Sequence, residues 1–128
     1  MEPRELLEAA RSASQRAYAP YSDFHVGAVV QLENGTVYAG CNVENASYGL
    51  SMCAERNAVA AMVAGTEERK IQSVAVASPD AAPCMPCGAC RQVLREFGCE
   101  KVVVEVESGP RSFGFDEILP HSFGPETL

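Results

Sequence analysis

Four residues in two parts of the chain could together bind a metal ion and move protons. The first part is Cys-Ala-Glu at residues 53–55, and the second is Pro-Cys-Gly-Ala-Cys at residues 86–90. Three thiolates suit zinc, and three protein ligands leave the fourth tetrahedral position to a water molecule that the metal acidifies. The Glu55 carboxylate is then a candidate proton carrier beside that water. The spacing therefore predicts one catalytic zinc on Cys53, Cys87 and Cys90.

A further thiol near this group leaves another kind of zinc site open. Cys84 lies three residues before Cys87 and could complete a four-thiolate structural site, although Pro86 stiffens the backbone between them. The chain would then be a zinc-stabilised interaction module without enzymatic activity. A structural site has no use for a carboxylate at Glu55, so the combined pattern favours catalysis over this alternative.

The charge of such a zinc site requires compensation. Zinc with three thiolates carries a net charge of about −1 and ionises water less readily than zinc with neutral ligands. Two expected helix N-termini supply partial positive charge and amide donors. Arg56, next to Glu55, could donate hydrogen bonds to the ligand sulfurs and reduce their charge. We therefore expect Arg56 to support the metal site.

Helices that follow strands must position these residues. In open α/β sheets, reactive groups collect beyond the carboxyl ends of the strands, so two helix N-termini can bring Cys53, Cys87 and Cys90 to one point. Apolar spacing, Pro and Gly positions predict three helices. They run from Pro3 to about Tyr18, from close to Cys53 to Gly65 with Ser51 as a possible cap, and from about Pro86 to Gly98.

Strand-like runs and one tight turn complete the expected architecture. Asn34 and Gly35 can supply the positive φ angles of a tight hairpin, so the runs that flank them should pair antiparallel. The alternation of strands and helices that follows predicts parallel crossovers and a mixed sheet with helices on its faces. A short fifth strand and a terminal helical turn are expected after residue 110. The runs are residues 26–32, 36–41, 71–78 and 101–106, and the terminal turn is 116–119.

Composition and charge restrict the class of protein. The 128 residues suffice for a single domain, 1–128, without repeats or long linkers. Ten Lys and Arg against 17 Asp and Glu give a net charge of −7, which opposes binding to nucleic acids and to anionic membranes. No apolar run approaches the ~20 residues of a membrane span, and the N-terminus is acidic where a signal peptide would be basic. We expect a cytoplasmic protein, in whose reducing compartment clustered thiols bind metal or act in catalysis.

Six segments, in order along the chain, resemble the small homotetrameric cytidine deaminase family. The likeness extends from about Tyr18 to Phe123, which is most of the chain. The resembling segments are APYS at 19–22, FHVGA at 24–28, NVENASY at 42–48, CAERNA at 53–58, PCGACRQ at 86–92 and LPHSF at 119–123.

This resemblance implies a fold, a reaction and a cofactor. The fold would be a three-layer α/β/α sandwich with a mixed five-stranded sheet. The reaction would be the hydrolytic deamination of cytidine and deoxycytidine to uridine, deoxyuridine and ammonia, as in pyrimidine salvage. One zinc per chain would carry a hydroxide that attacks C4 of cytosine, and Glu55 would shuttle protons to N3 and to the leaving ammonia.

The resemblance also implies residues that bind the substrate. Asn42 and Glu44 would hold the ribose hydroxyls, and a carboxylate there would favour free nucleosides over nucleotides because it repels phosphate. Phe24 would line the base pocket and the Ala54 backbone would contact the pyrimidine edge. Phe123 would reach the base in a neighbouring subunit of the homotetramer, which would make the active sites shared. Packing in a hydrophobic core is the alternative role for both aromatic rings.

Two related enzyme classes share parts of the pattern. Blasticidin S deaminases resemble this chain in the Cys-Ala-Glu and Pro-Cys-Gly-x-Cys elements, but the intact stretch at residues 42–47 favours an ordinary nucleoside substrate. Editing deaminases of tRNA or DNA resemble a pattern in which His is the first ligand, and the net charge of −7 argues against a polynucleotide substrate.

Overall fold

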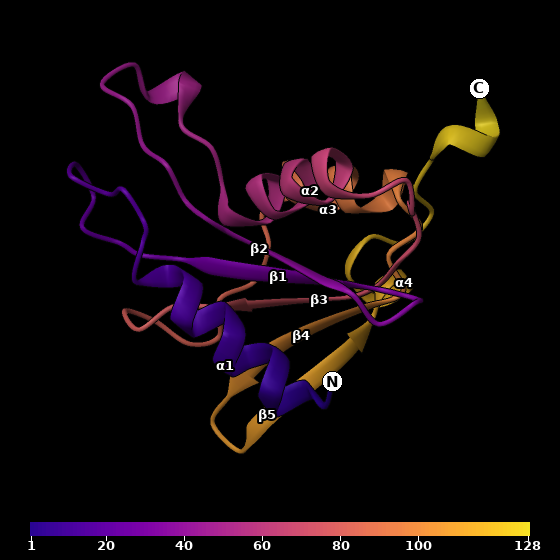
Figure 1. Ribbon diagram of the computed structural model, residues 1–128, viewed down its shortest axis with the longest axis horizontal. Helices are drawn as coiled ribbons and strands as arrows, with labels where there is room; N and C mark the ends of the chain where they lie inside the picture. Colours follow the sequence, from indigo (N-terminus) through magenta and orange to yellow (C-terminus); the bar gives the residue numbers. More distant parts are fainter.

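A mixed five-stranded sheet forms the centre of the computed structural model, which describes residues 1–128 (Figure 1). The strand order is β2-β1-β3-β4-β5. Only β3 and β4 pair in parallel, and all other neighbours are antiparallel. The strands are β1 (Gly27–Leu32), β2 (Val37–Cys41), β3 (Ile71–Ala77), β4 (Lys101–Val106) and β5 (Gly109–Gly114).

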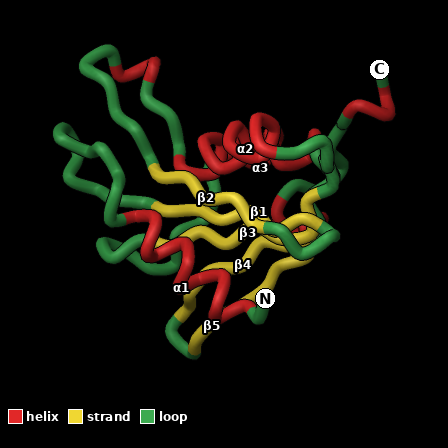
Figure 2. The backbone as a smooth tube through the Cα atoms, in the orientation of Figure 1, coloured by secondary structure: helices red, strands yellow, loops and turns green.

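Helices cover both faces of this sheet, which gives the expected three layers (Figures 1 and 2). Helix α1 lies on one face, where Leu6, Leu7 and Ala10 pack against Val29 and Val103. Helices α2 and α3 lie on the other face, over a larger core of 16 buried residues. The helices are α1 (Pro3–Ser14), α2 (Ala54–Gly65), α3 (Gly88–Glu96) and the short α4 (Phe115–Ile118), with single 3₁₀ turns η1 (Tyr48–Leu50) and η2 (Pro125–Thr127).

The central position of β1 explains its sequence. It lies between β2 and β3 with helices over both faces, so all six of its residues are buried and nearly all are apolar. Strand β2 forms the edge of the sheet and keeps exposed positions. Since β2 and β3 both run antiparallel to β1, they point in the same direction, and α2 makes a crossover that leaves β1 between them.

Gly40 in β2 sets how closely α2 approaches the sheet. A Cβ atom at this position would lie 2.4 Å from the Ala58 nitrogen and 2.7 Å from the Ala54 carbonyl oxygen. Only glycine therefore allows the helix backbone to rest directly on the strand. Because α2 begins at Ala54, this contact also fixes how close Cys53, the residue before the helix, lies to the sheet.

The first helix ends earlier than its apolar spacing indicates. It stops at Ser14 rather than near Tyr18. The Tyr18 backbone nitrogen donates to the Asn42 carbonyl oxygen at 3.0 Å, and the Tyr18 carbonyl oxygen accepts from the Glu44 nitrogen at 2.8 Å. These bonds form a β-bridge between Tyr18 and Val43, so tertiary pairing overrides the helical pattern.

The hairpin turn also differs in detail from the expectation. Within this turn, Gly35 has a positive φ angle of 91°, whereas the φ angle of Asn34 is not positive. The Gly35 nitrogen donates to the Leu32 carbonyl oxygen at 2.9 Å, which centres the turn one residue earlier. The Asn34 side chain instead accepts from the Thr36 nitrogen and hydroxyl at 3.0 and 2.7 Å, and so closes the turn from its side chain.

Of the three remaining expectations, one is corrected and two are confirmed. The cap of α2 is Cys53 rather than Ser51, whose hydroxyl accepts from the Asn45 nitrogen at 3.1 Å instead. Helix α3 begins after Cys87 and ends at Glu96, within the expected limits. The sheet is mixed as predicted, and β3 and β4 form its one parallel pair. None of the helices combines the length and apolar character needed to cross a membrane.

Candidate active site

Three cysteine sulfurs meet where α2 and α3 begin. Cys53 is the N-cap of α2, Cys87 is the N-cap of α3, and Cys90 lies in the first turn of α3. Their sulfur atoms all lie within 4.8 Å of one another, and the Cys53 and Cys87 Sγ atoms are 3.9 Å apart. Cys90 is buried and Cys87 is exposed, so the cluster opens to one side.

The donor set and its spacing fit zinc. Tetrahedral zinc with bonds of about 2.3 Å to sulfur places its ligand atoms about 3.8 Å apart, close to the separation of the Cys53 and Cys87 sulfurs. Cys84 does not join the cluster; it lines the neighbouring cavity instead. The four-thiolate structural site is therefore not supported.

Positive charge lies directly beside the sulfurs. The Arg56 Nη2 atom donates to the Cys53 Sγ atom at 3.3 Å, whereas the Arg56 Nε atom is buried without a partner. A hydrogen bond from the Cys90 thiol, followed by the Arg56 guanidinium, lowers the pKa of Cys53 to about 5. The same bond raises the pKa of Cys90. The first proton is therefore lost from Cys53 rather than Cys90, and a bound dication would favour the ionised form of the thiol ligands.

Glu55 adds a carboxyl group to the same place. It lies in the first turn of α2 and is only 4% exposed. Burial, followed by the nearby Cys53 thiolate, raises the pKa of Glu55 to about 7. A carboxyl group with a pKa near neutrality can both accept and donate a proton at physiological pH.

A cavity of about 290 Å³ opens in front of this carboxylate. Its volume lies near the lower limit of ordinary ligand pockets, about 300 Å³, so it suits a small molecule. Four of the expected binding residues line it together with Glu55 and Cys84; they are Phe24, Asn42, Glu44 and Ala54. Phe24 is 37% exposed and faces the cavity rather than the core.

Glu44 is held firmly at the rim of this cavity. Its Oε1 atom accepts from the backbone nitrogens of Tyr21 and Ser22 at 2.9 and 3.2 Å, and its Oε2 atom accepts from the Ser22 hydroxyl at 2.5 Å. The Ser22 hydroxyl lowers the pKa of Glu44 below its usual range. Glu44 also lines a second cavity of about 270 Å³ beside Tyr48. An ionised carboxylate therefore stands where the two cavities adjoin.

Asn42 has a structural role that the sequence did not reveal. Its Oδ1 atom accepts from the Val26 nitrogen at 2.8 Å, and its Nδ2 atom donates to the Phe24 carbonyl oxygen at 2.8 Å. The amide therefore fastens the segment that carries Phe24. One lone pair and one N–H remain for a ligand.

A second contact that holds the segment of Phe24 was not predicted from the sequence. The Asp80 Oδ2 atom accepts from the His25 backbone nitrogen at 2.7 Å and lies 3.0 Å from the His25 Nδ1 atom. These residues are 55 positions apart in the chain, so no local motif could connect them. The pair ties the segment of Phe24 to the loop that leads to the metal cluster.

Phe123 does not contribute to the cavity of its own chain. Its side chain is 62% exposed, so the alternative of core packing is wrong for this residue. The C-terminal segment leaves the body on the side opposite the long loop that carries η1 (Figure 1). The ring is therefore available to another molecule.

Comparisons with known proteins agree with this geometry. Residues 1–106 match the family described as "Cytidine and deoxycytidylate deaminase zinc-binding region". A cytidine deaminase of Sporosarcina psychrophila is 43% identical over 100% of this chain and 96% of its own length. One of Mycobacterium tuberculosis is 41% identical over 93% of this chain and 87% of its own. The crystal structure of cytidine deaminase from Burkholderia pseudomallei superposes with a TM-score of 0.84 at 44% identity, covering 96% of this chain and 100% of the other.

Proposed function

This chain belongs to the cytidine and deoxycytidylate deaminase zinc-binding family, and from that membership we propose that it hydrolyses cytidine and deoxycytidine. Each turnover adds one water at C4 of cytosine and releases one ammonia, so that uridine or deoxyuridine is formed. The observation that carries this proposal is the convergence of three thiols and a buried carboxyl group at one small cavity. Such an activity fits a role in pyrimidine salvage.

Cys53, Cys87 and Cys90 are the residues that would hold the zinc. When bound, zinc supplies positive charge that lowers the pKa of a water molecule at neutral pH. Arg56 would withdraw charge from the Cys53 sulfur through its hydrogen bond at 3.3 Å. Both Cys53 and Cys87 are helix N-caps, so the amide groups of two helix starts add partial positive charge at the same place.

Glu55 would move the protons of the reaction. Its carboxylate accepts a proton from the attacking water and donates it to N3 of the pyrimidine, then accepts the proton of the new C4 hydroxyl and donates it to the departing amino group. Burial supports this role, because the raised pKa, about 7, lets the group change protonation state at little cost. The same burial excludes bulk water from the proton path.

The other cavity residues would bind and orient the nucleoside. Glu44 and Asn42 would bond the ribose hydroxyls, and the hydrogen bonds that fix Glu44 in place support a preformed acceptor. The negative charge of Glu44 would disfavour phosphorylated substrates. Phe24 would pack on the base, and the Ala54 backbone would contact the pyrimidine edge.

We further infer a homotetramer with shared active sites, in which Phe123 enters the pocket of a neighbouring subunit. Its exposure in the single chain supports this arrangement. Large apolar side chains are also exposed on the loops beside the cavity, as at an interface between subunits; they are Tyr18, Tyr21, Val43, Tyr48, Leu50 and Met52. All six cysteines are free, which supports a reducing, cytoplasmic location.

Ammonia release from purified, zinc-analysed protein tests the proposal. Cytidine and deoxycytidine should both release ammonia with zinc at one atom per chain, whereas CMP should react poorly. The Glu55→Gln variant, with zinc retained, is the matched control for contaminating activity. Absence of ammonia release from cytidine by the zinc-loaded protein would overturn the function, and equal turnover of CMP and cytidine would overturn the assignment of Glu44.

A further inference from the structure

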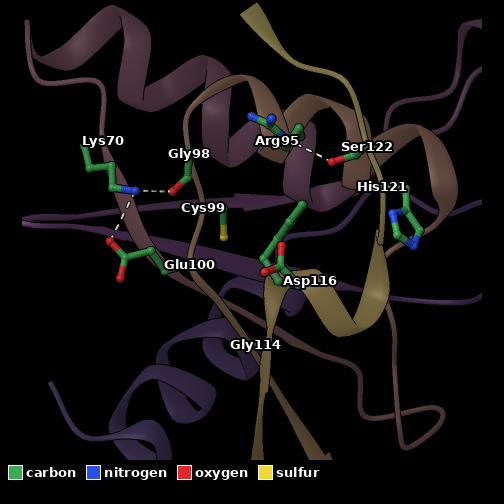
Figure 3. Close-up of a pocket in the computed structure, with 10 residues that line it drawn as sticks. Lys70, Arg95, Gly98, Cys99, Glu100, Gly114, Asp116, His121 and Ser122 are labelled. Carbon is green, nitrogen blue, oxygen red and sulfur yellow. Dashed lines mark hydrogen bonds and ion pairs between the residues drawn. The ribbon is translucent and has the colours of Figure 1, made fainter. Parts of the chain in front are cut away.

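The side chains of α3 hold the C-terminal segment that carries Phe123. The Arg91 Nη1 atom donates to the Ile118 carbonyl oxygen at 2.7 Å, and the Gln92 Nε2 atom donates to the Phe123 carbonyl oxygen at 3.1 Å. Arg95, one turn later, donates from Nε to the Ser122 hydroxyl at 3.0 Å (Figure 3). The helix that begins at the metal cluster therefore also anchors this segment.

Arg95 contacts the segment on both sides of Phe123. Before the ring it binds Ser122, and after the ring it forms an ion pair with Glu126. The Arg95 Nη1 atom donates to the Glu126 Oε2 atom at 3.3 Å, and its Nη2 atom contacts Oε1. The planar guanidinium thus binds a carboxylate through two nitrogens, which fixes direction as well as distance.

Hydrophobic packing does not fix this part of the segment. A cavity of about 600 Å³ lies between the end of α3 and residues 121–122, and only two of its ten lining residues are hydrophobic (Figure 3). Phe123 itself is 62% exposed. Polar contacts from α3 are therefore what determines where the ring stands.

Gly124 gives the Arg95 guanidinium the room it needs. A Cβ atom at this position would lie 2.3 Å from the Arg95 Nη1 atom and 2.6 Å from its Cζ atom. The three atoms nearest to this position all belong to the Arg95 guanidinium, so an added methyl group would have to displace it. The glycine and the arginine therefore act together.

We propose that Arg95 is a positioning residue for deamination: it holds Ser122 and Glu126 so that the Phe123 ring stands ready to enter the neighbouring subunit's pyrimidine pocket. This inference rests on the shared active site of the proposed function. A ring already held in place loses less conformational freedom when it covers the substrate, so the contact is made at lower cost.

The first test is the kinetics of Arg95→Gln. Stacking of Phe123 on the base is present in both the ground state and the transition state, so its weakening should raise KM. We expect KM for cytidine to rise about 3- to 10-fold, with kcat changed less than about 2-fold. Zinc content should not change. Arg69→Gln is the matched control, because Arg69 binds only the Thr66 and Glu68 carbonyl oxygens of its own turn.

The decisive readout is the combination with Phe123→Ala. If Arg95 acts through the ring, Arg95→Gln should add no further rise in KM once the ring is absent. Arg95→Lys keeps the positive charge but cannot bind the Glu126 carboxylate through two nitrogens, so its rise in KM should be smaller than that of Arg95→Gln. An undiminished effect of Arg95→Gln in the Phe123→Ala background would overturn the inference.

Variants outside the helix keep the inference testable if Arg95→Gln fails to fold. Glu126→Gln and Gly124→Ala should each raise KM in the same direction, and both effects should vanish without the Phe123 ring. Unchanged KM in both would contradict the role of Arg95. Phe123→Ala alone tests whether the site is shared. If this variant has the wild-type KM, the ring has no role, and the proposed sharing of sites is wrong independently of Arg95.

Discussion

Glu55 and Glu44 show how two carboxyl groups in one cavity acquire different properties. Glu55 is buried beside thiols, and its pKa is raised to about 7. Glu44 lies at the rim, where the Ser22 hydroxyl and two backbone nitrogens lower its pKa. The first group can exchange protons near neutral pH, whereas the second remains an anion that can only accept hydrogen bonds. In the proposed function, this difference would give proton transfer to Glu55 and substrate recognition to Glu44.

Glu55→Gln tests the first of these roles. A neutral amide fills the same space but cannot relay protons, so kcat should fall by at least about 10²- to 10⁴-fold. Zinc content and the far-ultraviolet circular dichroism should match the wild type, because the amide preserves the volume in the first turn of α2. A variant that keeps half of the wild-type kcat with full zinc would remove Glu55 from the mechanism.

Glu44→Gln tests the second role. Loss of a charged acceptor should raise KM for cytidine about 10- to 100-fold and change kcat much less. Ser22→Ala is the control, since it removes one contact to the carboxylate and leaves the charge. A larger loss in kcat than in KM would indicate that Glu44 acts in the chemical step.

Among the individual residues, the sequence predicted those that lie in short motifs. Cys53, Glu55, Cys87 and Cys90 stand at spacings that imply their chemistry, and the structure brings them together. The bonds from Asn42 to the Phe24 segment and the pair between His25 and Asp80 could not be predicted. Each joins segments whose proximity exists only after the sheet and its loops have formed.

Helices α2 and α3 each connect the metal cluster to another part of the molecule. Helix α2 begins at Cys53 and rests on Gly40 of β2, whereas α3 begins at Cys87 and holds the C-terminal segment. The sequence predicted these helices and all five strands from periodicity. It did not predict that β1 separates β2 from β3, because apolar alternation identifies a strand without identifying its neighbours.

Gly40→Ala tests the close packing of α2 on the sheet. The added methyl group meets backbone atoms at 2.4 and 2.7 Å, which cannot move without shifting the helix. We expect a loss of about 1–3 kcal/mol in the free energy of unfolding by urea. Gly49→Ala, where a Cβ atom meets nothing within 4 Å, should change stability far less. Equal effects of the two substitutions would show that the contact is not tight.

For the whole molecule, a chain of 128 residues with a net charge of −7 forms most of a binding site but leaves one aromatic ring outside it. The sequence could predict this sharing only through resemblance, since no composition or spacing indicates contacts between chains. In the structure, Phe123 is 62% exposed and lines none of the cavity of its own chain, which is what a ring used by another subunit would require.

Mixed oligomers test whether the sites are shared. When Glu55→Gln and Phe123→Ala chains are refolded together in equal amounts, about one site in four should combine the wild-type form of both residues. Measured at a cytidine concentration well below KM, where loss of the ring lowers the rate, activity should then rise well above the sum of the two separate variants, toward a quarter of the wild-type level. A mixture with proven subunit exchange and no gain in activity would mean that Phe123 serves its own chain or none.

The position of Cys53 and Cys87 at the starts of two helices makes the fold respond to the supply of metal by mass action. A ligand that binds only the folded chain stabilises it by about 1.4 kcal/mol for each tenfold rise in its free concentration above Kd. The midpoint of thermal unfolding should therefore rise steadily as buffered free zinc is increased, and a chelator should lower it. Cys90→Ala should flatten this dependence, whereas Cys84→Ala should keep its slope. In a cell short of zinc, the amount of folded protein would then decline together with its activity.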